Sequence, residues 1–167
     1  AMFAFLGILY AVLYKHSYCV MANEYSSNFG NTRYKGEIIN HQWSKSAEFE
    51  NMFSDYVYNF ITPDVKYFSL LRPFYEIRIA KEFSKYKKYF PYFSSCNKNF
   101  TVKEIEKQGL WCRECPKCVF AFTLLSAFLP KKELLNIFKK NLYQDKNLLP
   151  LFKDILGLGE MKPFDCV

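Results

Sequence analysis

The sequence predicts an α/β fold in which part of a sheet domain is followed by a helical C-terminal cap. Two short apolar runs, residues 18–24 and 65–71, are typical of buried strands. Helical patterns lie before, between and after them, and three helical segments close the chain. A few strands alternating with many helices indicate half of an α/β sheet domain. The length of 167 residues and a composition that is 50% hydrophobic suit a domain with a real core and exclude a disordered tail.

The first segment, "AMFAFLGILYAVLY", carries no charge and stops at Lys15 and His16. A membrane-spanning helix needs about 20 apolar residues, and a secretory signal needs a positive leading region. We therefore predict a buried core helix and no membrane partner. Because the run opens inside a helical pattern without a capping residue, we expect a piece of a longer protein. The lack of a secretory signal predicts a cytoplasmic location, where thiols stay reduced.

Residues 18–24 are predicted to form a strand that leads into a polar loop over residues 26–46. This loop, "SSNFGNTRYKGEIINHQWSKS", is long for a structureless connection, and such loops are often sites. The pattern turns helical over residues 43–61, where an apolar stripe is expected to face the core. The stripe consists of Phe49, Phe53, Tyr56, Val57 and Phe60. Pro63 ends this helix.

After the second strand, Pro73 suits the start of a helix, because its missing N–H is not needed there. The apolar face of that helix is expected to hold Phe74, Ile77, Ala80 and Phe83. The "TVKE" run at 101–104 is a capping box that predicts another short helix. Three helices are then predicted: a central apolar one at 116–129, an amphipathic one at 130–143, and one at 147–157 between an Asn cap and Gly157.

Polar side chains in the loop and beside the second strand are the candidate site residues. We predict catalytic roles for Glu24, His41 and Lys45, and substrate-binding roles for Asn23, Ser26, Asn28, Asn31, Asn40, Gln42, Ser44, Ser46 and Arg72. His41 could transfer a proton or bind substrate, or it could be a loop histidine at a helix entry. Lys45 could meet a phosphate or carboxylate, or be solvated. Glu24 could hold Mg²⁺ or a ribose.

Three of these candidates have a structural alternative that is at least as good. Arg72 could reach an anionic substrate or form a surface ion pair. Ser44 and Ser46 suit a helix cap better than a nucleophile, because they precede the helical pattern.

Four of the six cysteines gather in residues 96–118 with the spacing Cys-x15-Cys-x2-Cys-x2-Cys. Tetrahedral zinc takes four such thiolates, and in a reduced compartment clustered cysteines bind metal more often than they form disulfides. We predict a structural zinc ion held by Cys96, Cys112, Cys115 and Cys118. A redox Cys-x2-Cys pair and inert buried thiols are the alternatives. Cys19 is expected to be a core thiol, and Cys166 has no assigned role.

The net charge of +7 comes with small lysine clusters at 85–88, 131–132 and 139–140. Such a balance favours anionic partners such as nucleotides, phosphorylated metabolites or nucleic acid. Solvated helix edges explain the clusters more simply.

The sequence resembles the bacterial UDP-N-acetylmuramoyl-L-alanyl-L-glutamate epimerase family. The resemblance rests on "ANEYSSNFGN", "NHQWSKSAEFE", "PDVKYFSLLRPFYEIRIAK", "SCNKNF", "WCRECPKCVF" and "KPFDCV", in that order. It implies the helix-rich C-terminal half of a Rossmann-like ATP-pyrophosphatase domain over residues 1–95. A four-cysteine zinc site and helical cap follow over residues 96–167.

The resemblance also implies a reaction. With ATP and Mg²⁺, family members convert the terminal L-Glu of UDP-MurNAc-L-Ala-L-Glu to D-Glu through an acyl adenylate, for peptidoglycan synthesis. The phosphate-gripping SGGxDS-type loop of the superfamily is absent from this sequence, so we expect the isolated chain to be inactive.

Two other functions share some of these features. An ATP pyrophosphatase of the 7-cyano-7-deazaguanine synthase type has a similar zinc pattern, but the "NHQWSKSAEFE" block favours the epimerase. A zinc-stabilised nucleic-acid-binding module would use the basic surface. It is disfavoured because the lysines do not interleave with aromatic residues around the cysteines.

Overall fold

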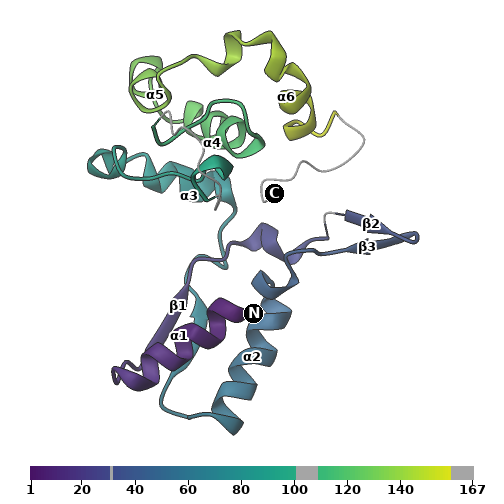
Figure 1. The fold of residues 1–167 in the computed structure, drawn as a ribbon, viewed down its shortest axis with the longest axis vertical. Helices are drawn as coiled ribbons and strands as arrows, with labels where there is room; N and C mark the ends of the chain where they lie inside the picture. Colours follow the sequence, from purple (N-terminus) through teal and green to yellow (C-terminus); the bar gives the residue numbers. More distant parts are fainter. Residues whose placement is uncertain (31, 101–108, 159–167) are drawn as a thin grey trace. The chain divides into compact units, whose positions relative to one another are not determined.

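The computed structural model describes residues 1–30, 32–100 and 109–158 and divides the chain into two compact units, Ala1–Glu76 and Ile77–Val167. Figure 1 shows the sheets in the first unit and the C-terminal helices in the second. The predicted α/β class is confirmed. The capping box at 101–104 lies outside the described residues.

The first unit is built on a two-stranded parallel sheet. Strand β1 (Tyr18–Met21) pairs with β4 (Lys66–Ser69), with Tyr18 opposite Lys66 and Met21 opposite Ser69. Helix α2 (Ala47–Phe60) lies in the long connection between the strands, and helix α1 (Met2–Leu13) precedes them. Both predicted strands are confirmed, although each is shorter than its apolar run. Figure 1 shows both helices beside this sheet.

One face of the sheet carries the core of the first unit. Its buried side chains come from both helices and from β4 and the residue before it, and they are Ala4, Ile8, Ala11, Phe49, Phe53, Val57, Val65 and Tyr67. Cys19 and Met21 of β1 pack against this cluster. The outer face is different, since Tyr18, Val20 and Phe68 are exposed there. The expectation that both strands are fully buried is therefore wrong for the described chain.

Helix α1 forms where the sequence predicts it, but it is not a buried core helix. Only Ala4, Ile8 and Ala11 are buried, whereas large apolar side chains such as Phe3 and Leu13 are 74% and 67% exposed. The uniformly apolar pattern gave no indication of which stripe faces the sheet. The stripe that faces the core contains Ala4 and Ala11 beside Ile8. The small alanine side chains let the helix approach the sheet closely.

Helix α2 begins later than predicted, at Ala47, because residues Trp43–Lys45 form a short 3₁₀ turn. Ser46 caps the helix by accepting a hydrogen bond from the N–H of Phe49. Phe49, Phe53 and Val57 face the core as predicted. Tyr56 and Phe60 of the predicted stripe are exposed instead. The helix ends at Phe60, before Pro63.

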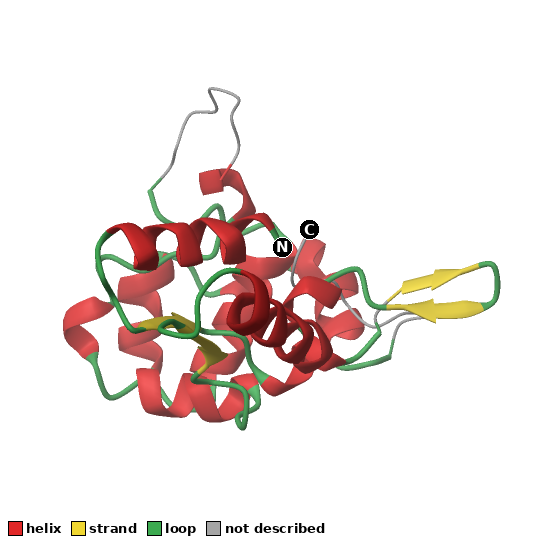
Figure 2. Ribbon diagram, turned by 90° about the horizontal axis from the view of Figure 1, so that it is seen from below, coloured by secondary structure: helices red, strands yellow, loops and turns green. Residues whose placement is uncertain are grey.

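The loop over residues 26–46 contains structure that the sequence analysis missed. Strands β2 (Thr32–Tyr34) and β3 (Glu37–Ile39) form an antiparallel hairpin, which projects from the first unit in Figures 1 and 2. Lys35 and Gly36 turn the chain with positive φ angles of 49° and 87°. That turn requires conformations that Gly adopts readily, which explains where the hairpin reverses.

The second unit is helical in its described part. Helix α3 (Glu76–Phe83) begins at the boundary between the units, so the predicted start at Pro73 is wrong, and Phe74 and Ile77 are exposed. Helix α4 (Pro116–Ser126) is central, as predicted, with Cys118, Val119, Phe122 and Leu125 buried. Its neighbours are α5 (Lys131–Phe138) and α6 (Leu149–Ile155).

The last two helices are shorter than their patterns predicted. Helix α5 ends at Phe138 because Lys139 adopts a left-handed conformation, with φ 59°. The Asp145 side chain, rather than Asn147, caps the turn before α6. Gly157 follows α6 with a positive φ of 72°, which suits the predicted glycine stop.

A chain of aromatic contacts runs through the second core. Trp111 contacts Phe93 and Phe138, with ring centroids 5.1 and 4.7 Å apart, and Phe138 contacts Phe122 at 5.2 Å.

In the described ranges of both units, the helices all fall short of the length and apolar character that a membrane crossing requires.

Candidate functional site: a cysteine cluster and a polar cluster

The four predicted ligand cysteines meet in the second unit. Cys96 lies just before a 3₁₀ turn at Asn97–Phe100, Cys112 and Cys115 lie in the loop before α4, and Cys118 is in the first turn of α4. Their sulfur atoms all lie within 4.8 Å of one another. Cys112 Sγ and Cys115 Sγ are 3.7 and 3.5 Å from Cys118 Sγ. Around a tetrahedral zinc ion with bonds of about 2.3 Å, sulfur atoms are about 3.8 Å apart.

Backbone N–H groups point at these sulfur atoms. The N–H of Cys112 donates to Cys96 Sγ at 3.3 Å, and those of Arg113 and Cys115 donate to Cys118 Sγ and Cys112 Sγ at 3.4 and 3.3 Å. Such bonds favour thiolates over thiols, because they place positive hydrogen atoms next to the developing charge. The backbone of Arg113 adopts a left-handed conformation, with a φ of 69°, where its N–H donates to Cys118 Sγ.

The thiols influence each other's ionisation strongly. A hydrogen bond shared with Cys118 lowers the pKa of Cys115 to about 4. The same bond, and then burial, raise the pKa of Cys118 far above its usual range, and burial raises the pKa of Cys112. Four adjacent thiolates need a cation to offset their repulsion. The donor set, spacing and N–H bonds fit a zinc ion, with no ligand position left for water.

A second cluster lies in the first unit, after the carboxyl ends of β1 and β4. We call it the polar cluster, and it consists of Asn23, Glu24, Ser26, Ser27, Glu50, Ser69, Arg72 and Glu76. Asn23 Nδ2 donates to Ser69 Oγ at 3.1 Å, which links the two strand ends. Ser26 Oγ donates to Glu24 Oε1 at 3.4 Å and also to Glu76. Two carboxylates therefore share one hydroxyl.

Arg72 holds the polar cluster together. It forms an ion pair with Glu50 at 2.8 Å, with only 15% and 14% of the two side chains exposed. It also donates to the carbonyl oxygens of Glu24 and Lys45 at 3.1 and 2.8 Å, and to Ser27 Oγ at 2.9 Å. The structure shows the ion pair that was one of the two hypotheses for Arg72. The pair with Glu50 is half-buried rather than at the surface.

Burial opposes the ionisation of Glu50, but hydrogen bonds from Ser69 and Arg72 and the charge of Arg72 outweigh it. The pKa of Glu50 therefore lies below its usual value. The Glu50 carboxylate is therefore ionised near neutral pH, and its ion pair with Arg72 is present there.

Several predicted binding residues form hydrogen bonds within the loop itself or with the start of α2. Asn28 Oδ1 accepts from the N–H of Ala47 at 2.7 Å, and Asn40 Nδ2 donates to the Ser27 carbonyl at 2.8 Å. Gln42 accepts from Lys45 Nζ at 2.8 Å. Ser46 is buried as the α2 cap.

The remaining predicted residues are placed as follows. Ser44 is half-buried in the 3₁₀ turn Trp43–Lys45, while His41 and Lys45 are exposed near it. Asn31 and Cys166 lie outside the described residues. Cys19 packs on the core of the first unit, as predicted, and burial raises its pKa.

Four residues of the polar cluster were not predicted as site residues: Ser27, Glu50, Ser69 and Glu76. Ser69 could have been found, because it is the polar residue at the end of a predicted strand. Glu76 and Glu50 lie on helices and carried no pattern of their own. Their place in the cluster follows only from the pairing of β1 with β4.

These features define a two-unit α/β protein with a candidate zinc centre and a polar cluster at the ends of parallel strands. Residues 1–70 match the family model of the MurL N-terminal domain, and residues 92–167 match that of the MurL C-terminal domain. The chain therefore belongs to the MurL family.

Similar proteins agree with this family. The chain is 40% identical over 160 residues to the UDP-N-acetyl-alpha-D-muramoyl-L-alanyl-L-glutamate epimerase of Xanthomonas oryzae pv. oryzae. This match covers 96% of this chain and 36% of that protein. It is 35% identical over 162 residues to the protein of the same name from Micromonospora sp., covering 97% and 36%. The chain thus spans about a third of the length of these curated relatives. No solved structure matches the chain.

Proposed function

We propose that the full-length protein containing this chain is an ATP-dependent epimerase of peptidoglycan synthesis. It inverts the terminal L-Glu of UDP-MurNAc-L-Ala-L-Glu to D-Glu. The observation that carries this proposal is the similarity to two proteins of that name at 40% and 35% identity over 96% and 97% of this chain. We place the enzyme in the cytoplasm, where its nucleotide substrates are made.

The position of the polar cluster supports the proposal. In open α/β sheets, ligands bind in the crevice outside the carboxyl ends of the strands. Asn23 and Glu24 follow β1 directly, and Arg72 follows β4. We further propose that this sheet is part of a Rossmann-like ATP-pyrophosphatase domain, because a parallel pair with helix α2 in its connection is the building unit of such domains.

The reaction follows from the acidity of the substrate. A negatively charged carboxylate makes the neighbouring Cα–H a very weak acid. The glutamate carboxylate attacks the α-phosphorus of ATP and releases pyrophosphate, and the resulting acyl adenylate no longer carries that charge. A base then removes the Cα proton, and an acid returns a proton to the opposite face. Water cleaves the adenylate to give the D-glutamyl product and AMP.

We propose roles for the chain's own residues in this sequence. Glu24, which shares the Ser26 hydroxyl with Glu76, holds the Mg²⁺ that accompanies ATP or the ribose. His41 and Lys45 serve proton transfer and binding of the carboxylate or phosphate. Asn23, Ser26 and Ser44 offer hydrogen bonds to the substrate. The cysteine cluster holds structural zinc, because it leaves no coordination position for substrate.

The test uses the full-length protein in heavy water with ATP, Mg²⁺ and UDP-MurNAc-L-Ala-L-Glu. We expect deuterium at the glutamate Cα and release of AMP. Changing His41→Ala or Lys45→Ala should slow exchange by about 10²–10⁴-fold if either transfers the proton, whereas Asp55→Asn, on the exposed side of α2, should leave it unchanged. The 167-residue chain alone should show no exchange. Consumption of ATP only with a deazaguanine acid, or RNA binding without ATP consumption, would refute the epimerase.

A further inference from the structure

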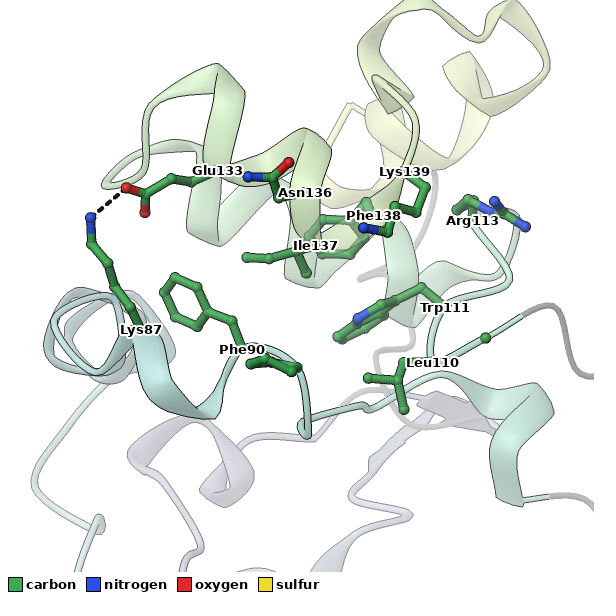
Figure 3. A pocket seen from close by; sticks show the side chains of 12 residues that line it. Lys87, Phe90, Leu110, Trp111, Arg113, Glu133, Asn136, Ile137, Phe138 and Lys139 are labelled. Carbon is green, nitrogen blue, oxygen red and sulfur yellow. Dashed lines mark hydrogen bonds and ion pairs between the residues drawn. The ribbon is translucent and has the colours of Figure 1, made fainter.

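The second unit contains a cavity of about 590 Å³ beside α5, and the cysteines of the cluster are not among its lining residues. Its size lies in the range of small-molecule sites, about 300–1,000 Å³. The cavity lies between the segment around Phe90, the chain from Gly109 to Arg113, and α5 with Lys139. Figure 3 shows the side chains of Phe90, Ile137 and Trp111 surrounding the same space.

The lining combines apolar and cationic groups. Phe90, Leu110, Trp111, Ile137 and Phe138 provide flat, apolar walls. Three cationic residues, Lys87, Arg113 and Lys139, and one acidic residue, Glu133, complete the lining together with Asn136. Lys87 pairs with Glu133 at one end, and Arg113 and Lys139 lie at the other end in the view of Figure 3. Two of the three cationic residues therefore lie away from the Lys87–Glu133 pair.

Two independent observations mark this cavity as more than a packing gap. Three residues that line it have positive φ angles, Gly109 at 89°, Arg113 at 69° and Lys139 at 59°. Left-handed conformations in residues with side chains are costly and gather at binding sites. In addition, Trp111 Nε1 and Glu133 Oε2 are buried without a hydrogen-bond partner among the described residues. An unpaired buried N–H is unfavourable, and a ligand carbonyl would supply the acceptor that the Trp111 indole lacks among the described residues.

We infer that this cavity binds the uridine diphosphate end of the substrate. The uracil ring packs against Phe90 and Leu110, and its carbonyl oxygens accept from the Trp111 indole. The diphosphate lies at the end with Arg113 and Lys139. This inference rests on the proposed function, which supplies a substrate carrying a planar base and a diphosphate.

The chemistry of the proposed reaction favours UDP over ATP for this cavity. ATP must bring its α-phosphorus to the glutamate carboxylate, so it belongs with the reacting groups. The uridine end is separated from that carboxylate by a sugar and two amino acids, so it can be held by other residues. Binding energy from such a remote part can then be used at the reaction centre.

The experiment uses the 167-residue chain loaded with zinc. The chain has two tryptophans, Trp43 and Trp111, so Trp43→Phe leaves Trp111 as the only fluorescent reporter. Titration with UDP, ADP and inorganic pyrophosphate should show saturable quenching by UDP, at a concentration at least tenfold lower than for the other two. Lys139→Gln should weaken UDP binding by about tenfold or more, as expected for a lost charge-assisted hydrogen bond.

Lys146→Gln is the matched control, since Lys146 is exposed in the same unit and does not line the cavity. It should leave UDP binding unchanged. Calorimetric titration of a Phe90→Leu variant gives a second readout, in which UDP binding weakens while pyrophosphate binding does not. Zinc content and the Trp111 emission maximum confirm that each variant is folded.

Several results would overturn the inference. They are no UDP binding, equal affinity for pyrophosphate, tighter binding of ADP, or equal effects of the Lys139 and Lys146 changes. The proposed function fails separately, through the deuterium exchange assay. UDP binding without exchange would keep the cavity assignment and reject the epimerase, whereas exchange without UDP binding here would do the opposite.

Discussion

Arg72 shows how one side chain can organise a site from a position that also suits ligand binding. Its guanidinium donates to two backbone carbonyls, a serine hydroxyl and the Glu50 carboxylate. The acceptors come from the turn after β1, from the turn before α2 and from α2 itself. An arginine beside a strand end can satisfy this geometry because its planar fork offers five donors. A substrate anion would have to compete with Glu50 for the same nitrogen atoms.

The Arg72–Glu50 pair gives a pH-dependent prediction. The pKa of folded Glu50 lies below its usual value of 4.5, so ionised Glu50 stabilises the fold above about pH 4.5. This contribution is lost as the pH falls through the folded-state pKa. Glu50→Gln should lower the free energy of unfolding by about 2 kcal/mol at pH 7, because it leaves the Arg72 charge half-buried and unpaired. The difference from wild type should shrink below pH 4.

Urea titrations monitored by Trp43 emission at several pH values measure this effect. Asp55→Asn is the control, since Asp55 is exposed on the same helix. A constant difference between wild type and Glu50→Gln from pH 7 to pH 3 would contradict the proposed linkage.

At the scale of elements, Gly7 sets how closely α1 approaches β1. A Cβ atom built on Gly7 would lie 2.6 Å from Cys19 Sγ, which is closer than such atoms can be. In the middle of a helix, Ala is otherwise about 1 kcal/mol better than Gly. Gly7→Ala should therefore destabilise the first unit by about 1 kcal/mol, because an overpacking cost of about 1–3 kcal/mol outweighs the helix gain.

A double-mutant cycle isolates this contact. In a Cys19→Ala background the sulfur is gone, so Gly7→Ala should become neutral or stabilising by about 1 kcal/mol. Thermal unfolding of the four proteins gives the coupling energy. If Gly7→Ala had the same effect in both backgrounds, the helix would not be held at this distance by the glycine.

The elements that the sequence predicted well are those with a strong periodic pattern or a specific spacing. Helix α4, with its buried Phe122 and Leu125, and the cluster of four cysteines are examples. The β2–β3 hairpin was missed because Thr32–Tyr34 and Glu37–Ile39 are too short to show alternation, and their apolar residues are largely exposed. Only some residues of the polar cluster were predicted from the sequence. Asn23 and Glu24 follow a visible strand, but Glu50 and Glu76 join them only through tertiary pairing.

At the scale of the whole molecule, each unit has a hydrophobic core of its own. The cysteine cluster belongs only to the second core, where Cys96 and Cys118 are completely buried. Structural zinc contributes directly to folding energy. Metal binding should therefore stabilise the second unit selectively.

Chelation should unfold the second unit while the first stays folded. Purified protein should contain about one zinc ion per chain. Removing it, or changing Cys112→Ser, should shift Trp111 emission to the red and abolish amide protection in residues 109–158, while Trp43 and residues 47–60 keep theirs. Cys19→Ser should retain the full zinc content. Stable folding of the second unit without metal would contradict a structural zinc site.

The outer face of the β1–β4 sheet has a consequence for the behaviour of the chain in solution. Tyr18, Val20 and Phe68 form an exposed apolar surface, and in the described residues this sheet has only two strands. Such a surface attracts other copies, and the net charge of +7 keeps them apart. This balance between attraction and repulsion controls the association of folded chains and not the fold of each chain. Raising the ionic strength to about 1 M shortens the reach of that repulsion to about 3 Å, so added salt should drive this fully folded chain out of solution.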